Sequence, residues 1–148
     1  MRVNNLIWIG LLILSGLVSA TDGKPVKPDK YQIRLDFITQ FAGEPKSSIP
    51  YLRNYDFEPL GKNALLLKYS GNKAYLLLLN NGCNSLTSSN AISINNHGST
   101  INAKFDSVRV ISRNNNIREK CQINQIQEVD VKAMKAEEAA IRESNKNA

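Results

Sequence analysis

A leucine-rich segment constrains the fold of this chain more than any other part of the sequence. Residues 63–70 and 73–80 are two mostly apolar runs on either side of the dipeptide Gly71-Asn72. A glycine at this position can adopt the positive φ that a tight two-residue turn requires. The segment therefore predicts a β-hairpin.

A two-residue turn at Gly71-Asn72 also predicts the register of the hairpin. It pairs Tyr69 with Ala74, Leu67 with Leu76 and Leu65 with Leu78 to form one apolar face. The opposite face then carries Leu66, Lys68, Tyr75, Leu77 and Leu79. Because both faces are apolar, we expect a central hairpin, covered by other strands on one face and by a helix on the other. Lys68 would lay its stem along Tyr75 and keep its ammonium in water.

Further alternation of apolar and polar residues extends the β prediction. Tyr31–Phe37 has a period of two and predicts a half-buried strand, although a short helix also fits this segment. Strands are also expected within Tyr51–Phe57, at Ala91–Asn95 and at Cys121–Val129, separated by segments rich in Gly, Pro and Asn.

The apolar phase changes at Asp106 and Ser107. Before this point Ile101 and Phe105 mark apolar odd positions, whereas Val108 and Val110 mark apolar even positions after it. The change predicts a β-bulge or a corner at which a strand bends between parts of a barrel.

The last segment changes from a strand period to a helix period. Asp130 can cap a helix from Val131 onward, because its carboxylate accepts free backbone N–H groups. We expect a helix at 130–143, whose first turns cover one face of the sheet, and a disordered tail at 144–148. The predicted fold class is mainly β: residues 31–129 form a small antiparallel barrel-like or strongly curved sheet of about six to seven strands, with a C-terminal helix.

The first twenty residues have the composition of a secretory signal peptide. Arg2 precedes the apolar run Leu6–Val18, and Val18-Ser19-Ala20 fits a cleavage site that would leave Thr21 as the first residue. The run is shorter than the roughly 20 apolar residues of a membrane span, so an uncleaved anchor is the less favoured alternative. Residues 21–30 predict a flexible tether. The mature chain has no transmembrane segment and is expected to be periplasmic or secreted.

The sequence contains two cysteines, Cys83 and Cys121, both in the predicted exported part. In an oxidising compartment two cysteines most simply form a disulfide, here closing a loop of 38 residues. Two buried thiols or a catalytic cysteine are the alternatives. A zinc site needs more Cys or His ligands than the chain offers, so no metal ligands are assigned.

The charge balance is basic. The full chain carries +6, and removal of Arg2 with the signal peptide leaves +5. Such a balance can favour polyanions such as nucleic acid, lipopolysaccharide or phospholipid headgroups. It can equally be a solubility device, and no run of basic residues is longer than two.

Candidate chemical groups are few. His97, the single histidine, could act as a general base beside Ser93 or Ser99, but it lies in a turn-like segment. Asp106, at the change of phase, could satisfy backbone N–H groups or mark a site, and the structural role is the favoured one. The remaining acids considered, Asp36, Asp56 and Glu58, are expected to face solvent and form no acid pair typical of glycosidases. No catalytic or cofactor-binding residue is assigned.

Aromatic residues on strands offer a second candidate surface. Together with Arg53 or Arg109 they could form a stacking platform for single-stranded nucleic acid, as in small β-barrels. Aromatic side chains on strands more often belong to the core. The residues concerned are Tyr51, Tyr55, Phe57, Tyr69, Tyr75 and Phe105.

Several short motifs together resemble a family of small exported bacterial proteins that is known only as a domain of unknown function. They follow the family's order over about residues 38–138: Phe41-Ala42-Gly43-Glu44-Pro45, Phe57-Glu58-Pro59-Leu60-Gly61, Ala74-Tyr75-Leu76-Leu77-Leu78-Leu79, Gly82-Cys83, Asn90-Ala91-Ile92, Ala103-Lys104-Phe105-Asp106-Ser107-Val108, Cys121-Gln122-Ile123 and Glu128-Val129-Asp130. Phe57 stands where many relatives have a tryptophan. The resemblance supports the disulfide and the bulge, places residues 113–120 in a loop of variable length, and implies no enzyme activity or cofactor.

We therefore expect a non-enzymatic, periplasmic or secreted domain that binds a ligand or associates with the cell envelope. Its partner is unknown and could be an envelope protein or an anionic polymer. The alternatives are a basic barrel that binds a polyanion, either nucleic acid or an anionic envelope glycolipid, and a hydrolase or an inhibitor of a hydrolase.

Overall fold

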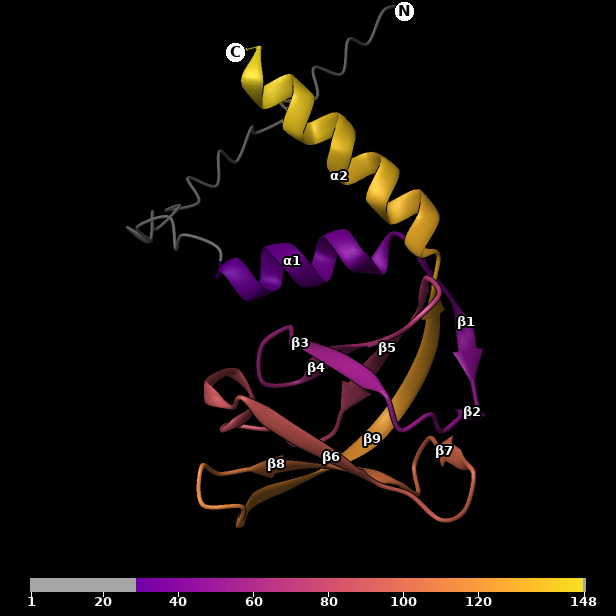
Figure 1. Ribbon diagram of the computed structural model, residues 1–148, viewed down its shortest axis with the longest axis vertical. Helices are drawn as coiled ribbons and strands as arrows, with labels where there is room; N and C mark the ends of the chain where they lie inside the picture. Colours follow the sequence, from indigo (N-terminus) through magenta and orange to yellow (C-terminus); the bar gives the residue numbers. More distant parts are fainter. Residues whose placement is uncertain (1–28, 148) are drawn as a thin grey trace, which may run out of the picture.

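The computed structural model describes residues 29–147, which form two helices, one short 3-10 helix and nine strands (Figure 1). The predicted signal peptide at 1–20 and all but the last two residues of the predicted tether lie outside the described residues. The elements in chain order are α1 (Lys30–Thr39), β1 (Ala42–Lys46), β2 (Ser48–Pro50), β3 (Tyr55–Pro59), β4 (Ala64–Tyr69), β5 (Lys73–Leu79), η1 (Leu86–Ser88), β6 (Ala91–Asn95), β7 (Thr100–Asn102), β8 (Ser107–Ile111), β9 (Ile117–Val129) and α2 (Val131–Lys146).

The strands form a strongly curved antiparallel sheet, which confirms the predicted fold class. Seven strands take part, in the order β3-β4-β5-β9-β8-β6, with β1 pairing along β9 as well. The long strand β9 pairs with β8 through its first half and with β5 and β1 through its second half, so the sheet bends into a half-barrel along it (Figure 1). Strands β2 and β7 pair with each other in a separate two-stranded ribbon.

The central hairpin β4–β5 is buried on both faces, as predicted. Leu65, Leu67 and Leu77 point into the half-barrel and belong to its interior core, with side chains from β6, β8 and β9. Leu66 and Leu76 point to the exterior, where they pack with Ile38 of α1 and Met134 of α2. Each face of the hairpin is therefore covered by a different part of the fold.

The predicted register of this hairpin is wrong by one residue. Tyr69 pairs with Lys73 and Leu67 pairs with Tyr75, because the turn contains three residues, Ser70-Gly71-Asn72, rather than two. Both Gly71 and Asn72 have positive φ, at 79° and 62°. The extra turn residue places Tyr75, Leu77 and Leu79 on the same face as Leu65 and Leu67.

The new register also changes the neighbours of Lys68. It pairs with Ala74 rather than lying along Tyr75. Its ammonium Nζ lies 3.3 Å from Asp56 Oδ2 and 3.7 Å from Glu58 Oε2.

The segment predicted as a strand at Tyr31–Phe37 is part of the helix α1. Asp29 caps the helix, because its side chain accepts the Tyr31 backbone N–H at 3.3 Å. Burial follows a helical period, since Ile38 is fully buried and Leu35 packs beside it, whereas Ile33 is 55% exposed. The strand prediction failed because every second residue of this segment is apolar, which imitates a strand period. The apolar residues are Tyr31, Ile33, Leu35 and Phe37, and not all of them contact the sheet.

The change of phase at Asp106 and Ser107 is a corner and not a bulge. Strand β7 ends at Asn102, a turn follows, and β8 starts at Ser107 in the other sheet. Lys104 in the turn has a φ of 70°, and Asp106 donates its backbone N–H to the Asn102 carbonyl at 3.0 Å. The two apolar phases therefore belong to two different strands.

Three predicted boundaries also change. The predicted strand in Tyr51–Phe57 starts only at Tyr55, and β9 starts at Ile117 rather than Cys121. Asp130 caps α2 as expected, accepting the Ala133 N–H at 2.9 Å, but the helix runs to Lys146, because no Gly or Pro interrupts it. The predicted disordered tail at 144–148 is therefore wrong for its helical part. Neither helix in residues 29–147 is long and apolar enough to span a bilayer.

Candidate functional site

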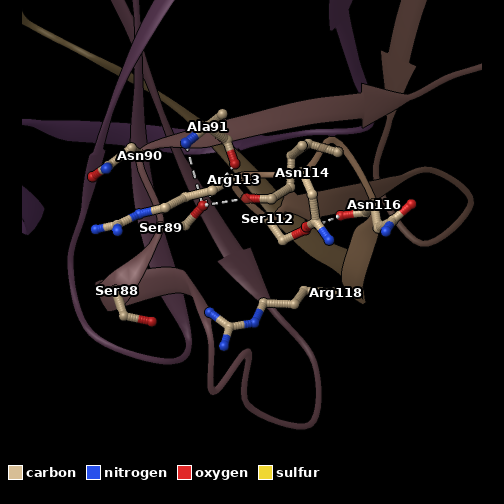
Figure 2. A pocket seen from close by; sticks show the side chains of 10 residues that line it. Ser88, Ser89, Asn90, Ala91, Ser112, Arg113, Asn114, Asn116 and Arg118 are labelled. Carbon is tan, nitrogen blue, oxygen red and sulfur yellow. Dashed lines mark hydrogen bonds between the residues drawn. The ribbon is translucent and has the colours of Figure 1, made fainter.

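A polar cavity opens at the end of the β8–β9 hairpin (Figure 2). Its volume is about 620 Å³. One wall is the segment 88–91, which leads from η1 into β6, and the other is the hairpin end at 111–118. The lining residues are Ser88, Ser89, Asn90, Ala91, Ile111, Ser112, Arg113, Asn114, Asn116 and Arg118.

Two arginines give this cavity its charge. Arg113 and Arg118 flank the turn Asn114-Asn115-Asn116, so the hairpin brings their side chains to the same cavity (Figure 2). Neither guanidinium forms an ion pair within the part of the chain that the structure describes. Among the described residues, the lining contains hydroxyl and amide groups but no acidic side chain. A site of this composition can bind an anion through charge-assisted hydrogen bonds.

The wall behind the arginines is held by its own hydrogen bonds. The single hydroxyl proton of Ser89 is shared between two acceptors, the carbonyl oxygens of Ala91 at 2.7 Å and of Ile111 at 3.3 Å, and so joins the two walls. Ser112 Oγ donates to the Asn116 carbonyl at 3.1 Å across the hairpin turn. These bonds fix the backbone, while the two guanidinium groups keep their donors available.

Next to the cavity, the outward positions of β6, β8 and the first half of β9 form a surface that we name the exterior strip. Its residues are Ser93, Arg109, Ile111, Ile117, Lys120 and Gln122. Cross-strand pairing aligns Ser93, Arg109 and Lys120 in one row. Figure 1 shows both helices at the opposite end of the sheet, so neither covers this strip.

The half of the domain around the strip is strongly basic. Residues 79–125 contain five cations and two acids. The cations are Lys104, Arg109, Arg113, Arg118 and Lys120. Both acids interact with other groups of the fold: Asp106 is buried, and Glu119 accepts backbone N–H groups. The exposed charge of this half is therefore positive.

The corner before β8 is organised around the buried carboxylate of Asp106, which is 1% exposed. Its Oδ2 accepts the backbone N–H of Asn102 at 2.6 Å and the side-chain amide of the same residue at 3.0 Å. Its Oδ1 lies 3.1 Å from Nδ1 of His97. Burial alone would raise the pKa of Asp106, but the hydrogen bonds from Asn102 and His97 outweigh it and lower the pKa below its ordinary value.

His97 is 83% exposed in its side chain. Within residues 29–147 its side chain contacts Asp106, and neither Ser93 nor Ser99 forms a hydrogen bond with it. The proposed pairing of His97 with a serine is therefore not present. The geometry agrees with the structural role expected for Asp106, which ties the β6–β7 turn to the corner.

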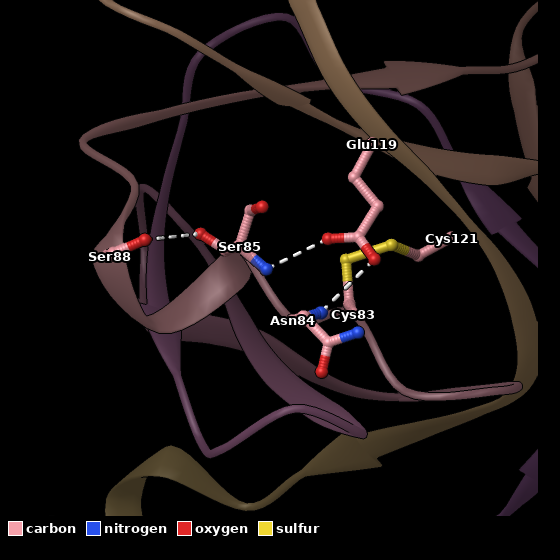
Figure 3. The surroundings of a disulfide bond; sticks show 6 residues. All are labelled: Cys83, Asn84, Ser85, Ser88, Glu119 and Cys121. Atoms are coloured by element: carbon pink, nitrogen blue, oxygen red, sulfur yellow. Dashed lines mark hydrogen bonds between the residues drawn. A yellow bond between two sulfur atoms is a disulfide. The ribbon is translucent and has the colours of Figure 1, made fainter.

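The predicted disulfide joins Cys83 and Cys121, with a Cα–Cα distance of 5.7 Å (Figure 3). It connects the loop after β5 to β9. Glu119 lies beside it and accepts the backbone N–H groups of Ser85 at 2.8 Å and Asn84 at 3.2 Å. The hydrogen bond from Ser85 is the main reason that the pKa of Glu119 is lowered.

Potential metal ligands also come together at the disulfide. One ligand atom from each of Cys83, Glu119 and Cys121 lies within 4.8 Å of the others. The two sulfur atoms are bonded to each other, and a metal would need them as thiolates. In the oxidised protein this group therefore does not present a metal site.

The predicted stacking platform does not form, because five of its six aromatic residues pack in or against the interior core. Tyr51, Tyr55, Tyr69 and Tyr75 form a chain of tilted and edge-to-face contacts, with ring centroids 6.4, 6.3 and 5.9 Å apart. Phe57 packs against the same core. Burial raises the pKa of Tyr69 to about 12. The expectation that strand aromatics belong to the core holds for these five residues.

Phe105 differs from the other aromatic residues of the proposed platform. Its side chain is 81% exposed in the turn between β7 and β8. The two arginines proposed for the platform lie elsewhere: Arg53 is exposed before β3, and Arg109 belongs to the exterior strip.

Of the acids expected to face solvent, Asp56 is 77% exposed in its side chain, as expected, whereas Glu58 is only 29% exposed and forms an ion pair. Arg34 of α1 contacts Glu58 of β3 at 2.7 Å and Glu138 of α2 at 2.6 Å. The hydrogen bond to Glu58 is the main cause of the raised pKa of Arg34. Asp56 contacts Lys68, whereas Asp36 lies exposed on α1. This cluster holds the two helices to the sheet edge.

The arginine cavity is not among the sites that the sequence predicts. The resemblance places residues 113–120 in a loop of variable length, but residues 117–120 belong to β9. One feature of the sequence does indicate that the two arginines lie close together. Arg113 and Arg118 stand on either side of three asparagines, and a tight hairpin turn brings such flanking residues together.

Among known proteins, the chain matches a family whose function is unknown. A family model described as a family of unknown function (DUF6491) matches residues 3–145. No curated protein and no solved structure matches the chain.

Proposed function

The chain belongs to this family of unknown function, and we propose that it is an exported, non-enzymatic domain of the cell envelope that binds an anionic ligand. The observation that carries the proposal is the cavity at the β8–β9 hairpin, where Arg113 and Arg118 meet hydroxyl and amide groups with no acidic side chain in the lining. The bound group would be a phosphate, sulfate or carboxylate, alone or as part of a polymer.

The chemistry of arginine supports an anion over a neutral ligand. A guanidinium presents several N–H donors in a planar fork that matches two oxygens of a carboxylate or phosphate. In many folded proteins surface arginines are neutralised by neighbouring acids, as Arg34 is here by Glu58 and Glu138. Arg113 and Arg118 have no such partner among the described residues, so their charge is available to a ligand.

The titratable groups near the corner support binding over catalysis. Asp106 uses both oxygens to hold Asn102 and His97, which is a structural task. His97 lies on an exposed turn and is not among the residues that line the cavity. A hydrolase, or an inhibitor of one, remains the competing proposal, and turnover of any substrate in a general hydrolase panel would favour it.

The proposed export depends on the first twenty residues and on the disulfide. We expect the protein recovered from the envelope fraction or the medium to begin at Thr21, because Val18-Ser19-Ala20 offers small residues at the cleavage site. Mass spectrometry of the intact protein measures this directly. Ala20→Leu should leave the longer chain uncleaved, whereas Val18→Ala should be processed normally. Recovery of wild-type protein that starts at Met1 would contradict the proposal.

Anion binding is tested with a soluble polyanion. We expect the processed protein to be retained on heparin and to elute earlier as the salt concentration rises, because each neutralised charge releases a counterion. R113Q/R118Q should bind at least about tenfold more weakly, since two charge-assisted contacts are lost. The dependence of log K on log salt should also become shallower.

The matched control is R53Q/R142Q, which removes the same charge from exposed positions outside the cavity. It should keep nearly all of the heparin affinity. Passage of the wild-type protein through the column without retention would refute the proposed function. An equal loss in both double variants would show that net charge, and not the cavity, determines binding.

A further inference from the structure

We infer that the exterior strip docks on the surface of an anionic phospholipid bilayer. The inference deepens the proposed function and rests on it, because a lipid phosphate would be the anionic group that the neighbouring cavity takes. It is carried by one juxtaposition: cations lie between two exposed apolar side chains, Ile117 at one end of the strip and Phe105 at the other.

The order of side chains along the strip follows from strand pairing. At the hairpin end Ile117 pairs with Ile111, and Ile117 is 54% exposed. The following row contains Arg109 opposite Lys120. Two cations directly opposite each other repel, and the strip, as far as residues 29–147 form it, contains no acid beside this pair. A negatively charged surface would relieve that repulsion.

The other end of the strip is the turn that carries Phe105. Gln122, the last outward residue of the strip, donates its side-chain N–H to the Lys104 carbonyl and so fixes this turn at the border of the strip. The Lys104 backbone N–H donates to Ile123 at 2.7 Å. Phe105 is therefore presented to solvent from a backbone held on both sides, at 81% exposure. Because the turn is already ordered, contact with a partner costs little further conformational entropy.

The kind of apolar side chain favours a bilayer over a nucleic acid. Single-stranded nucleic acid stacks successive bases on several aromatic rings. Here Tyr51, Tyr55, Tyr69 and Tyr75 pack in or against the interior core, and Phe105 is the one aromatic among the large exposed apolar side chains of residues 29–147. Ile117 cannot stack on bases, but both side chains can enter the boundary between headgroups and acyl chains while the cations contact lipid phosphates.

The test is sedimentation of the processed wild-type protein with vesicles. One set contains phosphatidylcholine and phosphatidylglycerol, and the other contains phosphatidylcholine alone. We expect binding that depends on phosphatidylglycerol. F105S/I117S should lower the partition coefficient about tenfold, because the apolar contacts are lost. K104Q/K120Q removes one cation from the strip and one from the turn that carries Phe105, and it should lower the partition coefficient roughly 20-fold.

Two matched variants control for general effects. I33S/I141S removes exposed apolar side chains from the helices, and R53Q/R142Q removes two cations outside the strip. Both should partition like the wild type. All the substituted side chains are exposed, and circular dichroism verifies that each variant is folded.

The outcomes separate this inference from the proposed function. Selective loss of vesicle binding in F105S/I117S, with heparin affinity retained, supports docking on the bilayer. Heparin retention by the wild type without any binding to phosphatidylglycerol vesicles overturns docking and leaves the anion cavity in place. An equal loss in I33S/I141S also overturns it. Absence of both heparin and vesicle binding refutes the two proposals together.

Discussion

Replacing Cys83 and Cys121 together by alanine is expected to lower the free energy of unfolding by about 4 kcal/mol. The disulfide closes a loop of 38 residues, and in the chain-entropy model its removal returns that conformational freedom to the unfolded state. The loop contains η1 and the strands β6, β7 and β8. Because domains of this size have free energies of unfolding of about 5–15 kcal/mol, the loss is a large share of the total.

Urea unfolding followed by circular dichroism measures the effect. The wild-type protein treated with a reductant should unfold at about the same urea concentration as C83A/C121A, and the reductant should leave that variant unchanged. Both sulfurs are buried, so alanine is a better replacement than serine, whose hydroxyl would need a hydrogen-bond partner. A loss of less than 1 kcal/mol would mean that the unfolded chain is already compact in this region.

Asp106→Ala should cost about 3 kcal/mol of the free energy of unfolding, the second large effect. The carboxylate accepts two hydrogen bonds from Asn102, and hydrogen bonds to a charged group contribute about 1.5–3 kcal/mol each. Its removal also leaves a backbone N–H at the corner without an acceptor. His97→Ala is the matched control and should cost less than about 1 kcal/mol, since His97 is exposed.

The effect of Asp106 should depend on pH in a defined direction. Its pKa is lowered in the folded protein, so the unfolded chain takes up a proton first as the pH falls. The stabilisation is complete above the ordinary value of about 3.9 and decreases as the pH drops through the lower native pKa. The difference between wild type and D106A should therefore shrink from pH 7 to pH 3. A constant difference over this range would show that the carboxylate charge does not contribute.

Much of the fold was predictable where local pattern and tertiary packing agree. The hairpin β4–β5 combines strong apolar runs with turn residues, and its burial on both faces followed from the absence of a polar side. The cap at Asp130 was predictable for a similar reason, because the capping residue directly precedes the change to a helical period.

The errors arose where the sequence pattern fits two structures. Tyr31–Phe37 alternates like a strand, yet it forms α1, which packs Leu35, Phe37 and Ile38 against the exterior of the sheet. The register of the β4–β5 hairpin depends on whether Ser70 belongs to the turn. The sequence does not decide this, because Gly71 and Asn72 both adopt positive φ and fit turns of either length. Both features were decided by tertiary contacts.

The candidate site was less predictable than the fold. The disulfide and the role of Asp106 could be inferred from composition and from the change of phase. The cavity could not, because it combines the hairpin end with the segment 88–91, and nothing local in the sequence indicates that these two segments meet. The exposure of Phe105 was hidden because it sits between apolar strands and resembles a core residue.

The position of β9 determines when this chain can fold. Among the strands of residues 29–147, β9 is the last in chain order, lies in the middle of the sheet and joins β5 to β8. Until residues near 129 have left the ribosome, the earlier strands cannot form the continuous sheet, and their apolar surfaces lack the partners that β9 supplies. Domains with such long-range pairing fold slowly. A nascent chain of this architecture therefore keeps two separate sets of paired strands in this sheet until β9 has been synthesised.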